Sequence, residues 1–212
     1  VAVPGFDCPQ TTERNPAYPF WYQTVNGRCS FDFNAVAAND ASMDNTSLFV
    51  KGEYDINENW QVYTSLSSTK TESFGRYAPV PGLVWAEDGT PNDLVQGDGL
   101  PTYFYHRFAA AGNRDQYTTG VNNDYLLGFK GQLTDTMSVE FGARRTNYDY
   151  DDLGYGYVIQ SLANAAINRG DYMLNDPYGA SQETLNGFTA TIGRNSFFRT
   201  KEMFANVTFD LF

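Results

Sequence analysis

The sequence predicts an all-β chain that forms about five antiparallel strands of a larger transmembrane β-barrel, with long extracellular loops. Three observations predict this fold: five segments alternate apolar with polar residues, two of their connections are minimal, and the other connections are very long. Short turns at one rim and long loops at the other are typical of membrane barrels, whereas compact soluble domains rarely contain unstructured loops beyond about 12–15 residues. We therefore expect residues 1–212 to belong to one β-barrel domain.

Each expected strand has one apolar and one polar face. In the first, Leu48, Val50 and Tyr54 lie on one face and Lys51 and Glu53 on the other, because successive side chains of a strand point to opposite sides. The expected strands lie near residues 46–56, 60–74, 115–133, 137–150 and 197–212. Asn57–Asn59 and Thr134–Thr136 are the expected short turns, and residues 1–45, 76–113 and 151–196 are the expected long loops.

The polar faces favour a water-filled lumen. They carry more charge than the core of a two-sheet soluble protein tolerates, because burying an unpaired charge costs several kcal/mol or more. These charged residues are Lys51, Glu53, Asp124, Lys130, Glu140, Arg144, Glu202 and Asp210. On the apolar faces, Trp60 and Tyr54 lie near the short turns, where an aromatic belt is expected. A soluble two-sheet protein with these charges facing solvent stays open as an alternative.

Composition and motifs argue against several other classes of protein. The net charge is −11, and no basic stripe that could follow a phosphate backbone is present in the sequence. No apolar run reaches the roughly 18 residues of a membrane helix. A single histidine, His106, without a G-x-S-x-G motif, a P-loop or a dinucleotide fingerprint predicts neither an enzyme nor a bound cofactor.

The two cysteines favour a disulfide over free thiols. Cys8 and Cys29 lie in one polar stretch without paired C-x-x-C spacing, so a zinc site is not expected. A disulfide would close a local loop and indicate an oxidising compartment such as the periplasm or the cell surface.

Aromatic side chains in the first two long loops are the candidate ligand-binding residues. The candidates are Trp21, Tyr22, Trp85, Tyr103, Tyr105, His106 and Arg107. They could stack on a sugar ring or a catechol, or they could pack the loops against their neighbours. A calcium site at Glu87, Asp88, Asn92, Asp93, Asp98 and Gly99 is disfavoured, because the EF-hand spacing is absent. In the third loop, Tyr157–Arg169 has helical periodicity and Gly170 is a possible C-cap.

Several segments resemble the TonB-dependent receptors of Gram-negative, especially gammaproteobacterial, outer membranes. The resemblance covers Asp55–Trp60, Ser73–Pro79, Gly112–Asp115, Leu127–Gly131, Gly154–Val158 and Ala205–Phe212. It implies a barrel of about 22 strands, plugged by an N-terminal domain, that imports ferric siderophores, cobalamin or oligosaccharides with energy passed through TonB. The sequence contains neither the plug nor the TonB-contacting segment, and Phe212 falls on the polar face, so we expect a section of a longer parent protein.

Two other functions stay open. A secreted carbohydrate-binding β-sandwich could use Trp21, Trp85 and Tyr105 to stack on sugars. A porin-like pore could be assembled from several copies that contribute a few strands each. In the receptor interpretation, the expected partners are outer-membrane lipid, the nutrient, and TonB through the missing N-terminal region of the parent.

Overall fold

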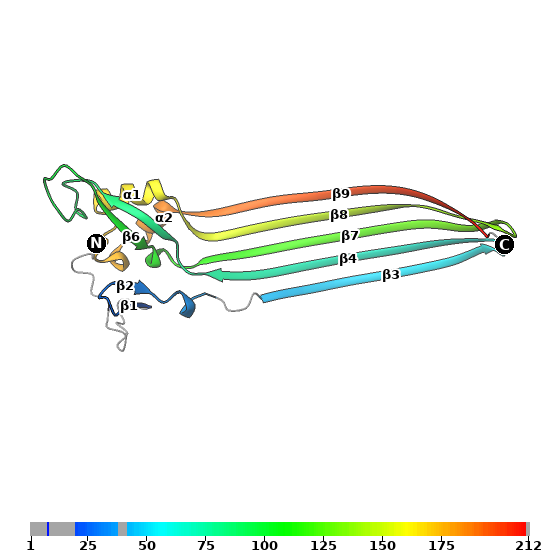
Figure 1. Cartoon of the computed structure of the whole chain (residues 1–212), viewed down its shortest axis with the longest axis horizontal. Helices are drawn as coiled ribbons and strands as arrows, with labels where there is room; N and C mark the ends of the chain where they lie inside the picture. Colours follow the sequence, from blue (N-terminus) through cyan, green and yellow to red (C-terminus); the bar gives the residue numbers. More distant parts are fainter. Residues whose placement is uncertain (1–7, 9–19, 38–41, 211–212) are drawn as a thin grey trace. The chain divides into compact units, whose positions relative to one another are not determined.

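A computed structural model describes residue 8 and residues 20–37 and 42–210, and its architecture is mostly β (Figure 1). The chain divides into two compact units. We call the first the strand unit; it comprises residues 42–73, 117–152 and 193–212. We call the second the loop unit; it comprises residues 1–41, 74–116 and 153–192. Within the described residues, no helix is long and apolar enough to cross a membrane.

A five-stranded antiparallel sheet dominates the strand unit, which confirms the prediction of five amphipathic strands. Its order is β3-β4-β7-β8-β9, so the strands of this sheet follow one another in chain order (Figure 1). The strands are β3 (Ser42–Asn57), β4 (Trp60–Tyr77), β7 (Arg114–Thr134), β8 (Met137–Val158) and β9 (Thr189–Phe209). Two residues separate β3 from β4 and β7 from β8, as the predicted short turns require. The described residues form an open sheet, without a closed barrel.

The strands extend further from the short turns than the alternation predicted. β8 continues to Val158 rather than residue 150, and β9 begins at Thr189 rather than residue 197. Polar pairs between the two strands contribute to these extensions. In the extensions, Arg194 contacts Asp152 and Asn195 donates to Asp151. Next to them, within the predicted spans, Arg199 contacts Asp149. Leu211 and Phe212 lie outside the described residues.

Ring contacts between strands identify the two faces of the sheet. Phe129 stacks on Phe141 with ring centroids 5.3 Å apart, and Trp60 meets Phe141 edge-on at 6.3 Å. These residues define the apolar face. On the opposite, polar face, the Tyr63 hydroxyl donates to Glu140 Oε1 at 2.6 Å, and Lys130 Nζ lies 4.9 Å from the Tyr63 ring centroid.

Two glycines of β7 admit large rings, one on each face. A Cβ on Gly131 would lie 2.6 Å from Trp60, and one on Gly128 would lie 2.2 Å from Tyr63. Real Cβ atoms do not approach other atoms so closely, so these rings lie over bare backbone. Because neither glycine has a side chain, the Trp60 and Tyr63 rings of β4 can lie directly against the backbone of β7.

The loop unit contains regular structure within the segments expected to be long loops. Its elements are β1 (Trp21–Gln23), β2 (Cys29–Phe31), β5 (Pro81–Ala86), β6 (Thr102–Arg107), α1 (Gln160–Arg169) and α2 (Gln182–Phe188). β1 pairs with β2 and β5 pairs with β6, in two hairpins. The predicted helix is confirmed over Gln160–Arg169, and Gly170 caps it at φ 84°. Tyr157 and Val158 belong instead to β8.

Aromatic side chains from distant segments build the core of the loop unit. Phe108 contacts Tyr172 and Phe188 at centroid distances of 5.7 Å, and all three side chains are buried. Val84 and Phe104 add the inward face of the β5–β6 hairpin, and Ile167 the inward face of α1. Because these residues come from separate stretches of sequence, no periodicity in any one segment predicts their association.

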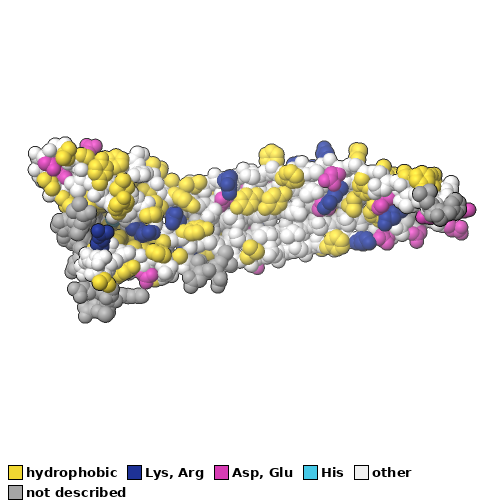
Figure 2. Space-filling view, in the orientation of Figure 1, with side chains coloured by type: hydrophobic (Ala, Val, Ile, Leu, Met, Phe, Trp, Pro, Cys, Tyr) yellow, Lys and Arg dark blue, Asp and Glu magenta, His cyan; other side chains and the backbone are white. Residues whose placement is uncertain are grey.

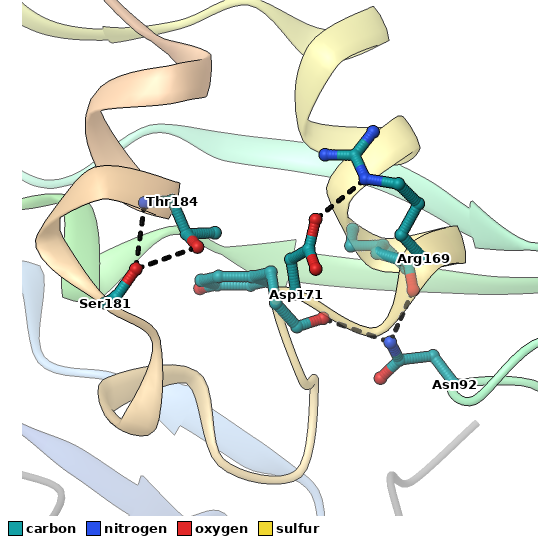
Figure 3. A network of polar contacts seen from close by, with 7 residues as sticks. Asn92, Arg169, Asp171, Ser181 and Thr184 are labelled. Carbon is teal, nitrogen blue, oxygen red and sulfur yellow. Dashed lines mark hydrogen bonds and ion pairs between the residues drawn. The ribbon is translucent and has the colours of Figure 1, made fainter.

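A buried amide joins the loop after β5 to the segment that contains α1. Asn92 Nδ2 donates to the carbonyls of Ile167 at 2.7 Å and Tyr172 at 3.0 Å, drawn as two dashed lines at the labelled Asn92 in Figure 3. Asn92 Oδ1 accepts from the Leu174 N–H at 2.7 Å. One side chain thus makes hydrogen bonds with three backbone groups of the α1 segment.

The Cys8–Cys29 disulfide is present, as the sequence favoured. The Cα atoms lie 5.8 Å apart, and the bridge spans 21 residues. In the chain-entropy model, a bridge that closes a loop of this length contributes about 3 kcal/mol by restricting the unfolded chain. The bridge therefore tethers the start of β2 to a segment that precedes β1.

Candidate functional site

The β5–β6 hairpin has an inward and an outward face, and most candidate residues lie on the outward one. Register pairs Trp85 with Tyr103, Leu83 with Tyr105 and Pro81 with Arg107, and side chains of paired residues share a face. Tyr105 is 94% exposed and Tyr103 55% exposed. The outward face is thus an aromatic surface that ends in one cation.

A pocket of about 440 Å³ lies between the two hairpins of the loop unit. Trp21, Phe31 and Phe33 line it from the β1–β2 side. Leu83, Tyr105 and Arg107 line it from the β5–β6 side. The volume lies within the range of about 300–1,000 Å³ that small-molecule sites occupy. The pocket is therefore large enough for a ligand of one or two rings.

Arg107 is the charged group of this pocket. Its Nη1 donates to the Pro79 carbonyl at 2.8 Å, and its guanidinium lies over the Phe31 ring, 5.6 Å from the centroid. Burial, together with the nearby positive charge of Arg114, lowers the pKa of Arg107. In the part of the chain that the structure describes, no carboxylate pairs with Arg107. The guanidinium is held in place but its charge is not neutralised there.

Trp21 forms part of the structural support of the pocket. It is 8% exposed and meets Phe31 edge-on, with centroids 5.4 Å apart. Its Nε1 donates to the Tyr178 hydroxyl at 3.3 Å. Only a small part of its ring can therefore contact a ligand. Tyr22 pairs with Ser30 in the hairpin and is not among the lining residues of the pocket.

His106 points into the core, opposite to its neighbours Tyr105 and Arg107. Its Nε2 lies 2.9 Å from the Tyr172 hydroxyl, and its ring meets Phe108 edge-on at 5.0 Å. It also contributes to the inner wall of the pocket. Burial lowers the pKa of His106 from 6.5 to about 4, so the imidazole is neutral at pH 7.

Acidification is expected to destabilise the loop unit through His106. Because its pKa is lower in the folded state, the unfolded chain binds more protons, and stability falls as the pH drops from about 6.5 to 4. The full effect is about 3 kcal/mol. Denaturant titrations at pH 7.5 and 4.5 should show a smaller pH dependence for His106→Gln than for the unmodified protein. Equal pH dependence in the two proteins would contradict this assignment.

Side-chain oxygen atoms of the acidic stretch after β5 accept hydrogen bonds from other groups of the protein. Asp88 accepts from the N–H of Gly99 at 2.9 Å, and Asp93 accepts from the Thr102 hydroxyl at 2.6 Å. Asn92 is buried against the α1 segment, as described above. Among the described residues, no group of three or more His, Cys, Asp or Glu side chains could hold a metal ion.

The structure brings together a subset of the candidate residues. Trp21, Tyr105, His106 and Arg107 line one pocket, and Trp85 and Tyr103 continue the outward face of the same hairpin. Sequence reasoning missed several lining residues, among them the large apolar side chains Phe31, Phe33 and Leu83. Leu83 lies two positions before the candidate Trp85, so the two-residue period of a strand was the available signal for one of them.

A second pocket, of about 760 Å³, lies on the polar face of the strand unit near the short turns. Its lining includes Asp55, Gln61, Lys130, Gln132, Glu140 and Asn206. Gln61 donates to Asp55 at 3.0 Å, so charged and amide groups of neighbouring strands are partnered across this surface. The polar face is thus suited to contact with water.

Comparison of the chain with protein-family models, with curated proteins and with solved structures finds no match.

Proposed function

We propose that this chain forms part of the wall and outward loops of an outer-membrane TonB-dependent receptor, which imports a scarce nutrient such as a siderophore, cobalamin or an oligosaccharide. The observation that carries the proposal is an apolar band on one face of the sheet. In this proposal lipid covers the band, the loop unit meets the nutrient, and TonB acts outside these 212 residues.

The band has the same position on all five strands. On each, an unbroken row of mostly apolar residues starts at the short-turn end of the strand: Leu48–Ile56, Trp60–Leu66, Tyr125–Leu133, Met137–Ala143 and Met203–Phe209, taking alternate residues. The next residue of each row is polar or charged: Thr46, Ser68, Asn123, Arg145 and Lys201. The rows of β3 and β7 span nine residues and rise about 26 Å, and the other three span seven residues and rise about 20 Å, compared with the roughly 25 Å apolar height of outer-membrane barrels.

Exposure within the band supports a lipid partner. Tyr54 is 70%, Leu127 50% and Val207 54% exposed, although they lie on a large regular sheet. Hydrophobic side chains are visible along the strands in Figure 2. Soluble monomers rarely expose contiguous apolar patches of more than a few hundred Å². In a β-sandwich a second sheet would cover such a face, and the described residues supply no such sheet.

Polar pairing beyond the band and on the other face agrees with the proposal. On the apolar face, Lys70 pairs with Glu72 beyond Leu66, the last residue of the β4 row. On the polar face, Arg144 Nε lies 2.8 Å from Asp124 Oδ2. The charged groups of the sheet thus lie where a barrel would place them in water.

The directions of the edge strands bear on closure. β3 and β9, the two edges of the described sheet, run in the same direction, because they are the first and fifth strands of an antiparallel series (Figure 1). Joining β9 of one copy to β3 of another would therefore create a parallel pair. An odd number of further strands restores an antiparallel ladder and gives an even total, as in bacterial barrels. This favours a section of one larger barrel over a pore made of copies.

Labelling from within a bilayer tests the proposal. The protein is reconstituted in lipid vesicles and exposed to a lipid-soluble photoactivatable carbene reagent, and labelled residues are located by mass spectrometry. Label is expected on Leu127, Phe141 and Val207, and not on Tyr63 or Gln132 of the polar face. Recovery of the protein as a detergent-free soluble monomer, or equal labelling of both faces, would overturn the proposal.

A further inference from the structure

The pocket between the β1–β2 and β5–β6 hairpins, which we call the hairpin pocket, has a positively charged lining in a negatively charged protein. The whole chain carries a net charge of −11, yet Arg107 is the one ionised side chain among the lining residues that the structure describes. No described lining residue is an Asp or Glu. Arg114, whose positive charge acts on Arg107, adds to the local positive potential. An anion is therefore the ligand charge that this pocket accommodates.

Arg107 is oriented in advance for an anion. One nitrogen is anchored on the Pro79 carbonyl, and the Phe31 ring supports the guanidinium. A guanidinium has five N–H donors, and Pro79 takes one of them. Because the side chain is already positioned, little additional rotamer entropy is lost when it binds a carboxylate.

The remaining lining selects a flat apolar body. Tyr105, Leu83 and Phe33 line the pocket while being 94%, 44% and 51% exposed. A bound ring would cover these surfaces and gain stacking contacts. A neutral sugar would need several hydrogen-bond partners for its hydroxyl groups, and the described lining offers few polar side chains besides Ser30 and Tyr105.

From this arrangement we propose that the hairpin pocket binds a small aromatic carboxylate, with the carboxylate on Arg107 and the ring between Tyr105 and Phe33. Binding depends on the pocket alone, whereas import of the ligand rests on the proposed receptor function. The neutral His106 forms part of the inner wall and adds no second charge.

Calorimetric titration of the purified protein tests this assignment with three probes of nearly equal shape. These are 2-naphthoate, its neutral amide 2-naphthamide, and the cation 2-naphthylmethylammonium. We expect 2-naphthoate to bind at least tenfold more tightly than the amide, and the cation to bind more weakly than either. Equal affinity for naphthoate and naphthamide would overturn the assignment.

Three variants separate charge from ring contact. Arg107→Gln should lose about tenfold in naphthoate affinity and little in naphthamide affinity. Arg169→Gln is the matched control, because Arg169 is an exposed arginine of the same unit that pairs with Asp171, and it should leave both affinities unchanged. Tyr105→Ala, at a 94% exposed side chain whose loss leaves the core intact, should weaken both ligands several-fold without changing their ratio.

The ligand titrations can be interpreted independently of the lipid-labelling experiment. If near-ultraviolet circular dichroism shows that Arg107→Gln fails to fold, the titration of Tyr105→Ala and the comparison of the three probes still test the proposed ligand class. Unchanged naphthoate affinity in Tyr105→Ala would contradict the assignment. Failure of binding with correct lipid labelling would reject the ligand class alone, whereas binding by a protein that labels equally on both faces would reject the barrel wall alone.

Discussion

Val207→Arg is expected to destabilise the membrane-inserted protein by about 2–4 kcal/mol, the cost of an arginine on the lipid face of a barrel near the middle of the bilayer. Val207 lies inside the apolar row of β9 and is 54% exposed. In lipid its replacement would place a guanidinium in hydrocarbon. Urea titration of the protein folded in lipid vesicles measures the change.

The neighbouring residue provides the control. Asn206→Arg, one position along the same strand, places the same charge on the polar face, where Asn206 lines the polar pocket with Glu140. We expect it to change the free energy of unfolding by less than about 1 kcal/mol. Equal destabilisation by the two substitutions would mean that the faces do not differ in their surroundings, and the lipid-facing band would have to be abandoned.

Asn92→Asp is expected to cost the loop unit at least about 3 kcal/mol of stability. The buried amide donates to two carbonyls and accepts one N–H. An aspartate would keep the acceptor but lose both donors, and it would direct a charged oxygen toward the carbonyls of Ile167 and Tyr172. Figure 3 shows the two donated hydrogen bonds meeting at the labelled Asn92 side chain. Amide hydrogen exchange of α1 would report the change as increased local opening.

An exposed asparagine of the same unit is the control for Asn92. Asn186 lies on α2, and its amide oxygen accepts from Gln182 at the surface. Asn186→Asp makes the same chemical change in water and should alter exchange in α1 very little. If the two variants behave alike, the three hydrogen bonds of Asn92 contribute nothing specific to the fold.

Local rules were sufficient for the sheet and for α1. Alternation around Leu48–Ile56, the short turn at Asn57–Asn59 and the Gly170 cap each depend on neighbours in sequence, and all three are present in the structure. The extensions of β8 to Val158 and of β9 back to Thr189 were missed, and pairs across strands such as Arg194 with Asp152 contribute to them. A sequence pattern does not reveal which distant charge a residue will meet.

The candidate site was predictable only in part, for the same reason. Period-2 alternation in β6 places Tyr105 and Arg107 on one face, and applied strictly it also places His106 on the opposite face. Phe31 and Phe33 come from a different hairpin, held near the first by tertiary contacts such as that of Arg107 with Phe31. Those contacts join residues more than seventy positions apart, so sequence spacing carried no signal for them.

The shared orientation of β3 and β9 also limits how such a sheet can change in size. Insertion of a whole hairpin leaves the orientation of every later strand unchanged, whereas insertion of a single strand would reverse them all. After such a reversal, the connections corresponding to residues 78–113 and 159–188 would emerge at the rim that now carries the two-residue turns. Evolution of this architecture by duplication would therefore proceed in units of two strands.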